Sequence, residues 1–434
     1  MTIRSFIVLS LLAGMAGLPA EASSQERAIR RDVPLTNSIR RAFAAGTRDS
    51  TGRPGRRYWQ LRTDYTISAR LDPSTSILSG SETVVVHNTS DSAMTSIVLR
   101  LDQNIFRPSV PRASPSVPSE ITDGLTLTKL TVNGEAVNMN PPSGRGAGGA
   151  PGSHTASGLT QTVARIALSA PIPAKSTATI EVDWNFKLAG GAGGSGHRMT
   201  ARWADSLYQV TQWYPRIAVF DDLRDGGWDT DLYLGPSEFY NNFGRFDVRI
   251  DVPAGWIVGA TGVLQNPERV LTPTMRERLS RVLASDSTIT IVGETETGPD
   301  PSTAAGDRLV WHFLADTVND FAWGTARQFV WKATRATIPG AGRVPIHMMY
   351  LPGRAQLYAN AASLTRYALE FYSKLWMPYG FAQLTLLDGP DTGMEYPMVI
   401  MSNQGAADHE AAHSWWPMMV SGNETWYGWM DEGF

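Results

Sequence analysis

Alternation between apolar and polar residues dominates the sequence from Tyr58 to about Thr337 and limits what the chain can fold into. A period of two places successive side chains on opposite faces, which is typical of half-buried β-strands. An Asn-Gly pair at residues 133–134 separates two short runs, which predicts a hairpin with a primed turn. Many short strands with turn residues between them predict an all-β domain, a sandwich or saddle. The clearest runs are residues 83–87, 96–101, 162–168, 179–184 and 246–252.

The pattern changes near residue 340. Residues 344–350 are expected to form a strand, and residues 355–376 carry apolar residues three and four positions apart, which predicts one apolar face of a helix. That predicted face consists of Leu357, Ala361, Leu364, Ala368, Phe371 and Leu375. His347 is interpreted as a buried, hydrogen-bonded residue rather than a metal ligand. We therefore predict an N-terminal β domain over 58–340 and the start of a mixed α/β domain over 341–434.

The first 22 residues have the three parts of a secretory signal peptide. Arg4 supplies the charge, residues 6–18 form the apolar region, and Ala20-Glu21-Ala22 is a cleavage site of the small-x-small type. The apolar region is too short to span a bilayer, and no later stretch is apolar for long enough. We expect an exported protein, periplasmic or secreted, with no stable membrane span. Residues 23–57 are rich in arginine and are predicted to be a solvated linker.

Composition excludes two kinds of function. The 434 residues include no cysteine, so cysteine nucleophiles and thiolate metal sites are ruled out. The net charge is −3 with 18% charged residues, which gives no electrostatic footprint for nucleic acid. Nucleic acid is therefore not an expected partner.

A metal-binding pattern lies in the last twenty-six residues. His409 and His413 are four positions apart, so on a helix both imidazoles can reach one metal ion. Glu432, in a second predicted helix over 425–434, would add a carboxylate oxygen as third ligand. Three protein ligands and one open position are typical of a catalytic zinc. Glu410 is placed to accept a proton from a metal-bound water.

A second motif, Gly393-Met394-Glu395-Tyr396-Pro397, precedes the first, and thirteen residues lie between Glu395 and His409. Together the two resemble the aminopeptidase N-like (membrane alanyl aminopeptidase type) zinc metallopeptidases of the gluzincin clan. They are most similar to a bacterial branch in which Gly-Met-Glu-Tyr-Pro and Trp-Met-Asp-Glu-Gly-Phe recur. The resemblance implies an N-terminal β domain followed by a zincin (thermolysin-like) catalytic domain with one zinc ion.

The resemblance also implies roles for single residues. By position, His409, His413 and Glu432 are the zinc ligands, and Glu410 is the catalytic base. The strand that contains Gly393, Met394 and Glu395 would lie along the substrate, with Glu395 binding the free α-ammonium group of a peptide. The stabilising tyrosine of the family lies well downstream of the third ligand, whereas this sequence ends two residues after Glu432. We therefore expect a C-terminally truncated, incomplete catalytic domain and an inactive fragment.

The expected function is hydrolysis of the N-terminal peptide bond of peptides by metal-activated water. A zinc endopeptidase of the thermolysin type is one alternative, because its ligand set is nearly the same. The ligand spacing and Glu395 argue against it. A non-catalytic peptide-binding fragment is the other alternative, and the intact ligands and Glu410 argue against that.

Overall fold

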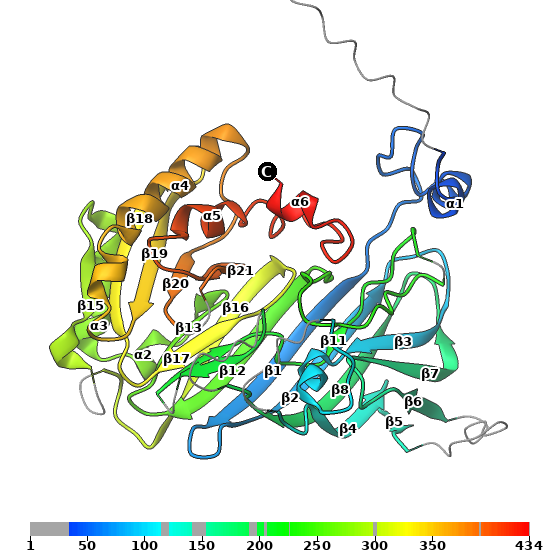
Figure 1. The fold of residues 1–434 in the computed structure, drawn as a ribbon, viewed down its shortest axis with the longest axis horizontal. Coiled ribbons are helices and arrows are strands. Elements are labelled where there is room, and N and C mark those ends of the chain that lie inside the picture. Colours follow the sequence, from blue (N-terminus) through cyan, green and yellow to red (C-terminus); the bar gives the residue numbers. More distant parts are fainter. Residues whose placement is uncertain are drawn as a thin grey trace, which may run out of the picture.

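The computed structural model describes residues 34–113, 121–140, 153–190, 198–203, 206–224, 226–297, 302–389 and 392–433. The predicted signal peptide lies outside these residues. Within them, none of the helices is both long and apolar enough to cross a membrane. The described part of the chain is rich in strands, which form three sheets (Figure 1).

The largest sheet contains twelve strands and accounts for most of the region before residue 320. Its neighbours are antiparallel except for the pairs β1–β12 and β5–β6. Strand β8 shows why this region alternates: buried and partly exposed residues follow one another along nearly its whole length. In order across the sheet the strands are β11 (Arg216–Ile217), β3 (Met94–Arg100), β7 (Val163–Ile172), β6 (His154–Ser157), β5 (Glu135–Asn138), β4 (Thr126–Val132), β8 (Ser176–Lys187), β2 (Ile77–Asn88), β1 (Arg62–Asp72), β12 (Gly244–Pro253), β16 (Arg308–Val318) and β14 (Val263–Leu264).

These strands confirm the runs predicted from alternation. The predicted hairpin is also confirmed, because β4 and β5 are joined at Asn133 and Gly134, which both have positive φ angles, 51° and 82°. A second sheet has four strands, all of whose residues are buried except two at one edge. It consists of β13 (Ile257–Ala260), β17 (Trp323–Ala326), β10 (Leu207–Val210) and β9 (Ala201–Trp203). A sandwich arrangement of the N-terminal strands stays a prediction.

The third sheet carries the candidate site. It has six strands in the order β15 (Ile289–Val292), β18 (Val330–Ile338), β19 (Gly342–Tyr350), β20 (Leu384–Leu387), β22 (Val399–Met401) and β21 (Met394–Tyr396). β19, β20 and β22 are parallel to one another, and β21 is an edge strand. The predicted division at residue 340 falls in the turn of the β18–β19 hairpin, so strands from both sides share this sheet.

The longest described helix, α4 (Ala361–Leu375), packs on this sheet and contacts the site helix α5 (Ala407–Ala412) (Figure 1). The predicted helical period is confirmed, but the predicted apolar face is buried only in part. Ala361, Thr365, Ala368 and Leu369 are buried, while Leu364, Phe371 and Leu375 are 39–56% exposed. Small side chains let the helix approach β18 closely, which leaves the larger apolar residues outside.

The remaining helices are short. They are α1 (Asn37–Ala45), α2 (Pro267–Val270), α3 (Pro273–Ser280) and α6 (Trp429–Glu432), with 3-10 turns at Asp102–Phe106, Val282–Ala284, Glu294–Glu296 and Ala355–Tyr358. Helix α1 lies in the segment that was predicted to be a solvated linker. Thr36 caps its N-terminus and Gly46, with φ 73°, ends it. Arg48 then pairs with Asp222 at 3.1 Å, which ties the segment to the β region.

Candidate metal centre and active site

Helix α5 brings the two histidines of the metal-binding pattern together. His409 lies on the helix and His413 is its C-terminal cap, one turn further on. Their Nε2 atoms are 3.1 Å apart. The His409 side chain is 57% exposed, while that of His413 is 4% exposed. The two histidines therefore lie at the boundary between the protein interior and the solvent.

Helix α6 places the third predicted ligand, Glu432, beside His409 and His413. Glu432 Oε2 lies 3.4 Å from His409 Nε2 and 3.8 Å from His413 Nε2. Atoms that bind a tetrahedral zinc ion at about 2.0–2.2 Å are separated from one another by ~3.4 Å. The three observed separations are close to that value. Two imidazole nitrogens and one carboxylate oxygen also match the donors that zinc prefers, so these residues fit the ion.

Asp431 orients His413 and was not singled out from the sequence. It is 3% exposed, and its Oδ1 is 2.8 Å from His413 Nδ1. The carbonyl oxygen of Trp416 lies 2.9 Å from the same nitrogen. A proton on Nδ1 that is donated to these acceptors leaves the Nε2 lone pair free for a metal. The position of Asp431 beside a predicted ligand was the available signal.

Glu410 lies on the buried side of α5 and points toward β21. It is 2% exposed, and its Oε2 has no hydrogen-bond partner among the described residues. Burial and the nearby charge of Glu395 raise the pKa of Glu410 to about 8. Gly393 has a φ of 93°, and a Cβ added there would lie 3.6 Å from Glu410 Oε1. The positive φ favours glycine at this position, whereas 3.6 Å would be an ordinary van der Waals contact.

Glu395 is held on the edge strand β21, beside the metal-binding residues. It is 3% exposed, and its Oε1 has no hydrogen-bond partner among the described residues. Burial raises the pKa of Glu395 to about 7, although the charge of His413 opposes the shift. Met394 is buried as well, and its Sδ lies 3.6 Å from Nη1 of Arg198. The outer edge of β21 has no strand paired to it among the described residues.

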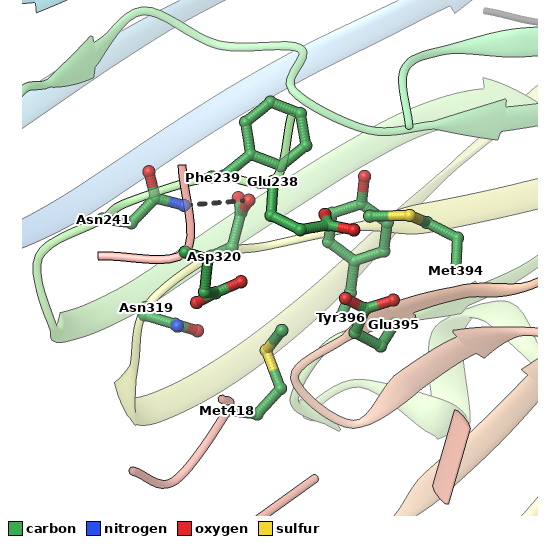
Figure 2. Close-up of a pocket in the computed structure, with 10 residues that line it drawn as sticks. Glu238, Phe239, Asn241, Asn319, Asp320, Met394, Glu395, Tyr396 and Met418 are labelled. Carbon is green, nitrogen blue, oxygen red and sulfur yellow. Dashed lines mark hydrogen bonds between the residues drawn. The ribbon is translucent and has the colours of Figure 1, made fainter. Parts of the chain in front are cut away.

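A small pocket opens beside Glu395 and contains acidic residues that sequence reasoning missed. Its lining includes Glu238, Glu395 and Glu424, together with Asn319 and Asp320. Figure 2 shows the carboxylates of Glu238 and Glu395 near each other on one side of the pocket, beside Met394. Since Glu238 lies in a loop far upstream, only the folded chain brings it here.

All predicted site residues thus converge. The ligand atoms of His409, His413 and Glu432 lie within 4.8 Å of one another. Met394 and Glu395 lie on β21, Gly393 immediately precedes that strand, and the strand contacts helix α5. His347, predicted not to be a ligand, accepts a hydrogen bond at Nδ1 from Trp331 Nε1 at 3.2 Å.

Comparison with solved structures identifies the fold. The sequence matches no protein-family model and no curated protein. The structure is similar to that of an M1 zinc metallopeptidase from Deinococcus radiodurans, with a TM-score of 0.51, 16% identity, and coverage of 88% of this chain and 70% of that one. For a mutant of an M1 zinc metallopeptidase bound to L-tryptophan, the TM-score is 0.51 and the identity 15%, with coverage of 88% of this chain and 71% of that one. For a mutant of the Deinococcus radiodurans M1 zinc metallopeptidase bound to a Tyr-Ser-Ala substrate, the TM-score is 0.50 and the identity 15%, with coverage of 88% and 70%.

Proposed function

We propose that this protein is a zinc aminopeptidase, which removes residues from the free N-terminus of peptides. The observation that carries the proposal is the convergence of His409, His413 and Glu432 within 4.8 Å, beside a buried carboxylate that faces a pocket. The fold of M1 zinc metallopeptidases supports the same reading. One of these neighbours is described as bound to a tripeptide substrate.

The chain's own residues would divide the reaction between them. A zinc ion bound to His409, His413 and Glu432 would polarise the scissile carbonyl and acidify the attacking water. Glu410 accepts the proton of that water and passes it to the leaving amine. Its raised pKa, about 8, suits a group that must both take and return a proton near neutral pH. No donor among the described residues reaches its buried Oε2, so that oxygen is free to accept the proton.

Glu395 is proposed as the group that selects for a free N-terminus. A carboxylate that is 97% buried can be stabilised by a charged α-ammonium group, whereas a blocked N-terminus would leave it unpaired. The open edge of β21 could pair with the main chain of an extended peptide. A thermolysin-type endopeptidase would have no use for such an anchor.

The test compares a peptide with a free N-terminus and the same peptide with an acetylated one. In an active, zinc-loaded form of the protein, only the free peptide should lose its first residue. Loss of a desolvated ion pair costs about 2–5 kcal/mol, so Glu395→Gln should lower kcat/KM by at least about 30-fold. Glu277→Gln, whose side chain is 69% exposed and distant in sequence, is the control and should change nothing.

Three results would point elsewhere. Internal cleavage of the acetylated peptide would support the endopeptidase. Calorimetric binding of the free peptide without turnover would support the non-catalytic peptide-binding alternative. Equal binding of both peptides without turnover would remove the anchor role from Glu395.

A further inference from the structure

Four buried carboxylates meet beside the metal-binding residues, and we call this group the acidic pocket. One oxygen from each lies within 4.8 Å of the corresponding oxygens of the others. They come from three separate segments, and a hydrogen bond of 2.7 Å from Thr425 Oγ1 to the carbonyl of Glu238 fastens two of those segments together. The members are Glu238, Glu395, Glu424 and Asp431, which are 7%, 3%, 6% and 3% exposed.

The acidic pocket contains more negative charge than its described neighbours neutralise. Arg198 forms an ion pair with Glu238. His413 contacts Asp431, but a histidine whose Nε2 binds a metal is neutral. Among the described residues, four carboxylates therefore face one permanent cation, Arg198. Burial and the charges of Asp431 and Glu395 raise the pKa of Glu424 well above its ordinary value, which is how an uncompensated carboxylate in such a place behaves.

Unpartnered oxygens point to a missing positive ligand. Glu395 Oε1 and Asp431 Oδ2 are buried and have no hydrogen-bond partner among the described residues. Asn319 Oδ1, in the lining of the adjoining cavity, has none either. The cavity has a volume of ≈ 10 Å³, about what one water-sized group needs. A small site whose free groups are all acceptors is suited to a single cation.

We propose that the acidic pocket is a second cation site, which binds one hard divalent cation of the Mn²⁺, Mg²⁺ or Ca²⁺ class in competition with the α-ammonium group of the substrate. The competition rests on the proposed function, because both cations would use Glu395. Hard cations take oxygen ligands at about 2.0–2.6 Å, so oxygens on opposite sides of the ion are ~4–5 Å apart. The observed limit of 4.8 Å fits that size.

Charge favours the divalent ion over a lone ammonium group. With Arg198 in place and all four carboxylates ionised, a bound divalent cation would leave a net charge of −1. A bound ammonium group would leave a net charge of −2. The two metal sites also differ in donor type. His409 and His413 offer nitrogen, which zinc prefers, and the acidic pocket offers oxygen alone. Each site should therefore keep its own ion when both metals are present.

The consequence for the enzyme is inhibition by its own second metal. A divalent cation in the acidic pocket would exclude the amino terminus of the peptide and leave the zinc ligands unchanged. Added Mn²⁺ should therefore raise KM and leave kcat unchanged.

The experiment titrates zinc-loaded protein with Mn²⁺ and follows the free-ion signal by electron paramagnetic resonance. We expect about one bound Mn²⁺ per chain beyond the zinc. Glu424→Gln should weaken Mn²⁺ binding by about tenfold or more, with the zinc content unchanged, because one of four charged ligands is lost. Glu277→Gln is the matched control. Glu238→Gln serves as a second variant if the first does not fold.

Competition is measured separately with an amino-acid amide, which has a free α-ammonium group, and with its acetylated form. The amide should displace Mn²⁺ and the acetylated form should not. Failure of Mn²⁺ to bind more tightly than about 1 mM, or binding that is the same in Glu424→Gln, would overturn the cation site. Calorimetry of the amide alone would still report on the aminopeptidase. Bound Mn²⁺ that the amide does not displace would overturn the shared site.

Discussion

Replacement of Asp431 by Asn tests whether the Asp431 carboxylate orients the imidazole of His413 toward the metal. The carboxylate lies 2.8 Å from His413 Nδ1 and is buried, so it holds the imidazole with Nε2 toward the metal. Loss of such a partner typically weakens metal binding by about 10–100-fold, or about 1.4–2.7 kcal/mol. We expect the lower end, about tenfold, because the carbonyl of Trp416 remains 2.9 Å from the same nitrogen.

Zinc affinity of the purified chain would be measured by competition with a chelating dye. Glu424→Gln is the matched control, since it removes one charge from the same pocket, while no hydrogen bond to His413 is lost. Zinc binding by Asp431→Asn that is as tight as in the unaltered protein would contradict this role of Asp431. Equal weakening in the control would contradict it too, because the effect would then come from charge at a distance.

Three further predictions follow from the site and its surroundings. His413→Ala should lose the zinc measured by elemental analysis, whereas Glu410→Gln should keep it and lose turnover; equal zinc content in both would contradict the ligand assignment. Gly393→Ala should lower the melting temperature by about 2–4 °C and reduce turnover, because Gly393 has a φ of 93° and lies beside Glu410. Gly353→Ala is the control: Gly353 has a φ of 79° and lies in open space, so its substitution should affect stability alone. Burial lowers the pKa of His347 from 6.5 to about 4, so the unfolded chain binds a proton at a higher pH than the folded chain does. The free energy of unfolding should therefore fall as pH drops from 6.5 to about 4, by no more than about 3 kcal/mol. Chemical denaturation of His347→Gln between pH 7 and pH 4 should lack that part of the slope; an unchanged slope would contradict it.

Local patterns account for what could be predicted from the sequence. The spacing of His409 and His413 fixes their relation within one helical turn, and the Asn133-Gly134 turn fixes the β4–β5 hairpin. Both depend on residues that are close together in the chain. The strands of the large sheet were predictable for the same reason, since alternation is a property of neighbouring residues.

Contacts between distant segments could not be predicted in the same way. Glu238 and Glu424 meet in one pocket although they are 186 positions apart in the sequence, and no local pattern predicts that contact. The packing face of α4 was predicted only in part, because Ala361 and Ala368 are buried whereas Leu364, Phe371 and Leu375 are exposed. Close approach to β18 favours small side chains such as Ala361, Thr365 and Ala368.

The β18–β19 hairpin makes the predicted domains inseparable as folding units. A fragment that ended at residue 340 would retain β15 and β18 as an isolated two-stranded ribbon, with the β19 side of β18 open along Val330–Ile338. Such an edge, with Trp331 and Ile338 among its buried apolar residues, is a template for aggregation. The complementary fragment would lack the strand on which α4 packs. The metal-binding segment after residue 340 is therefore not a module that can be exchanged or expressed by itself, and loss of order on one side of residue 340 should spread to the other.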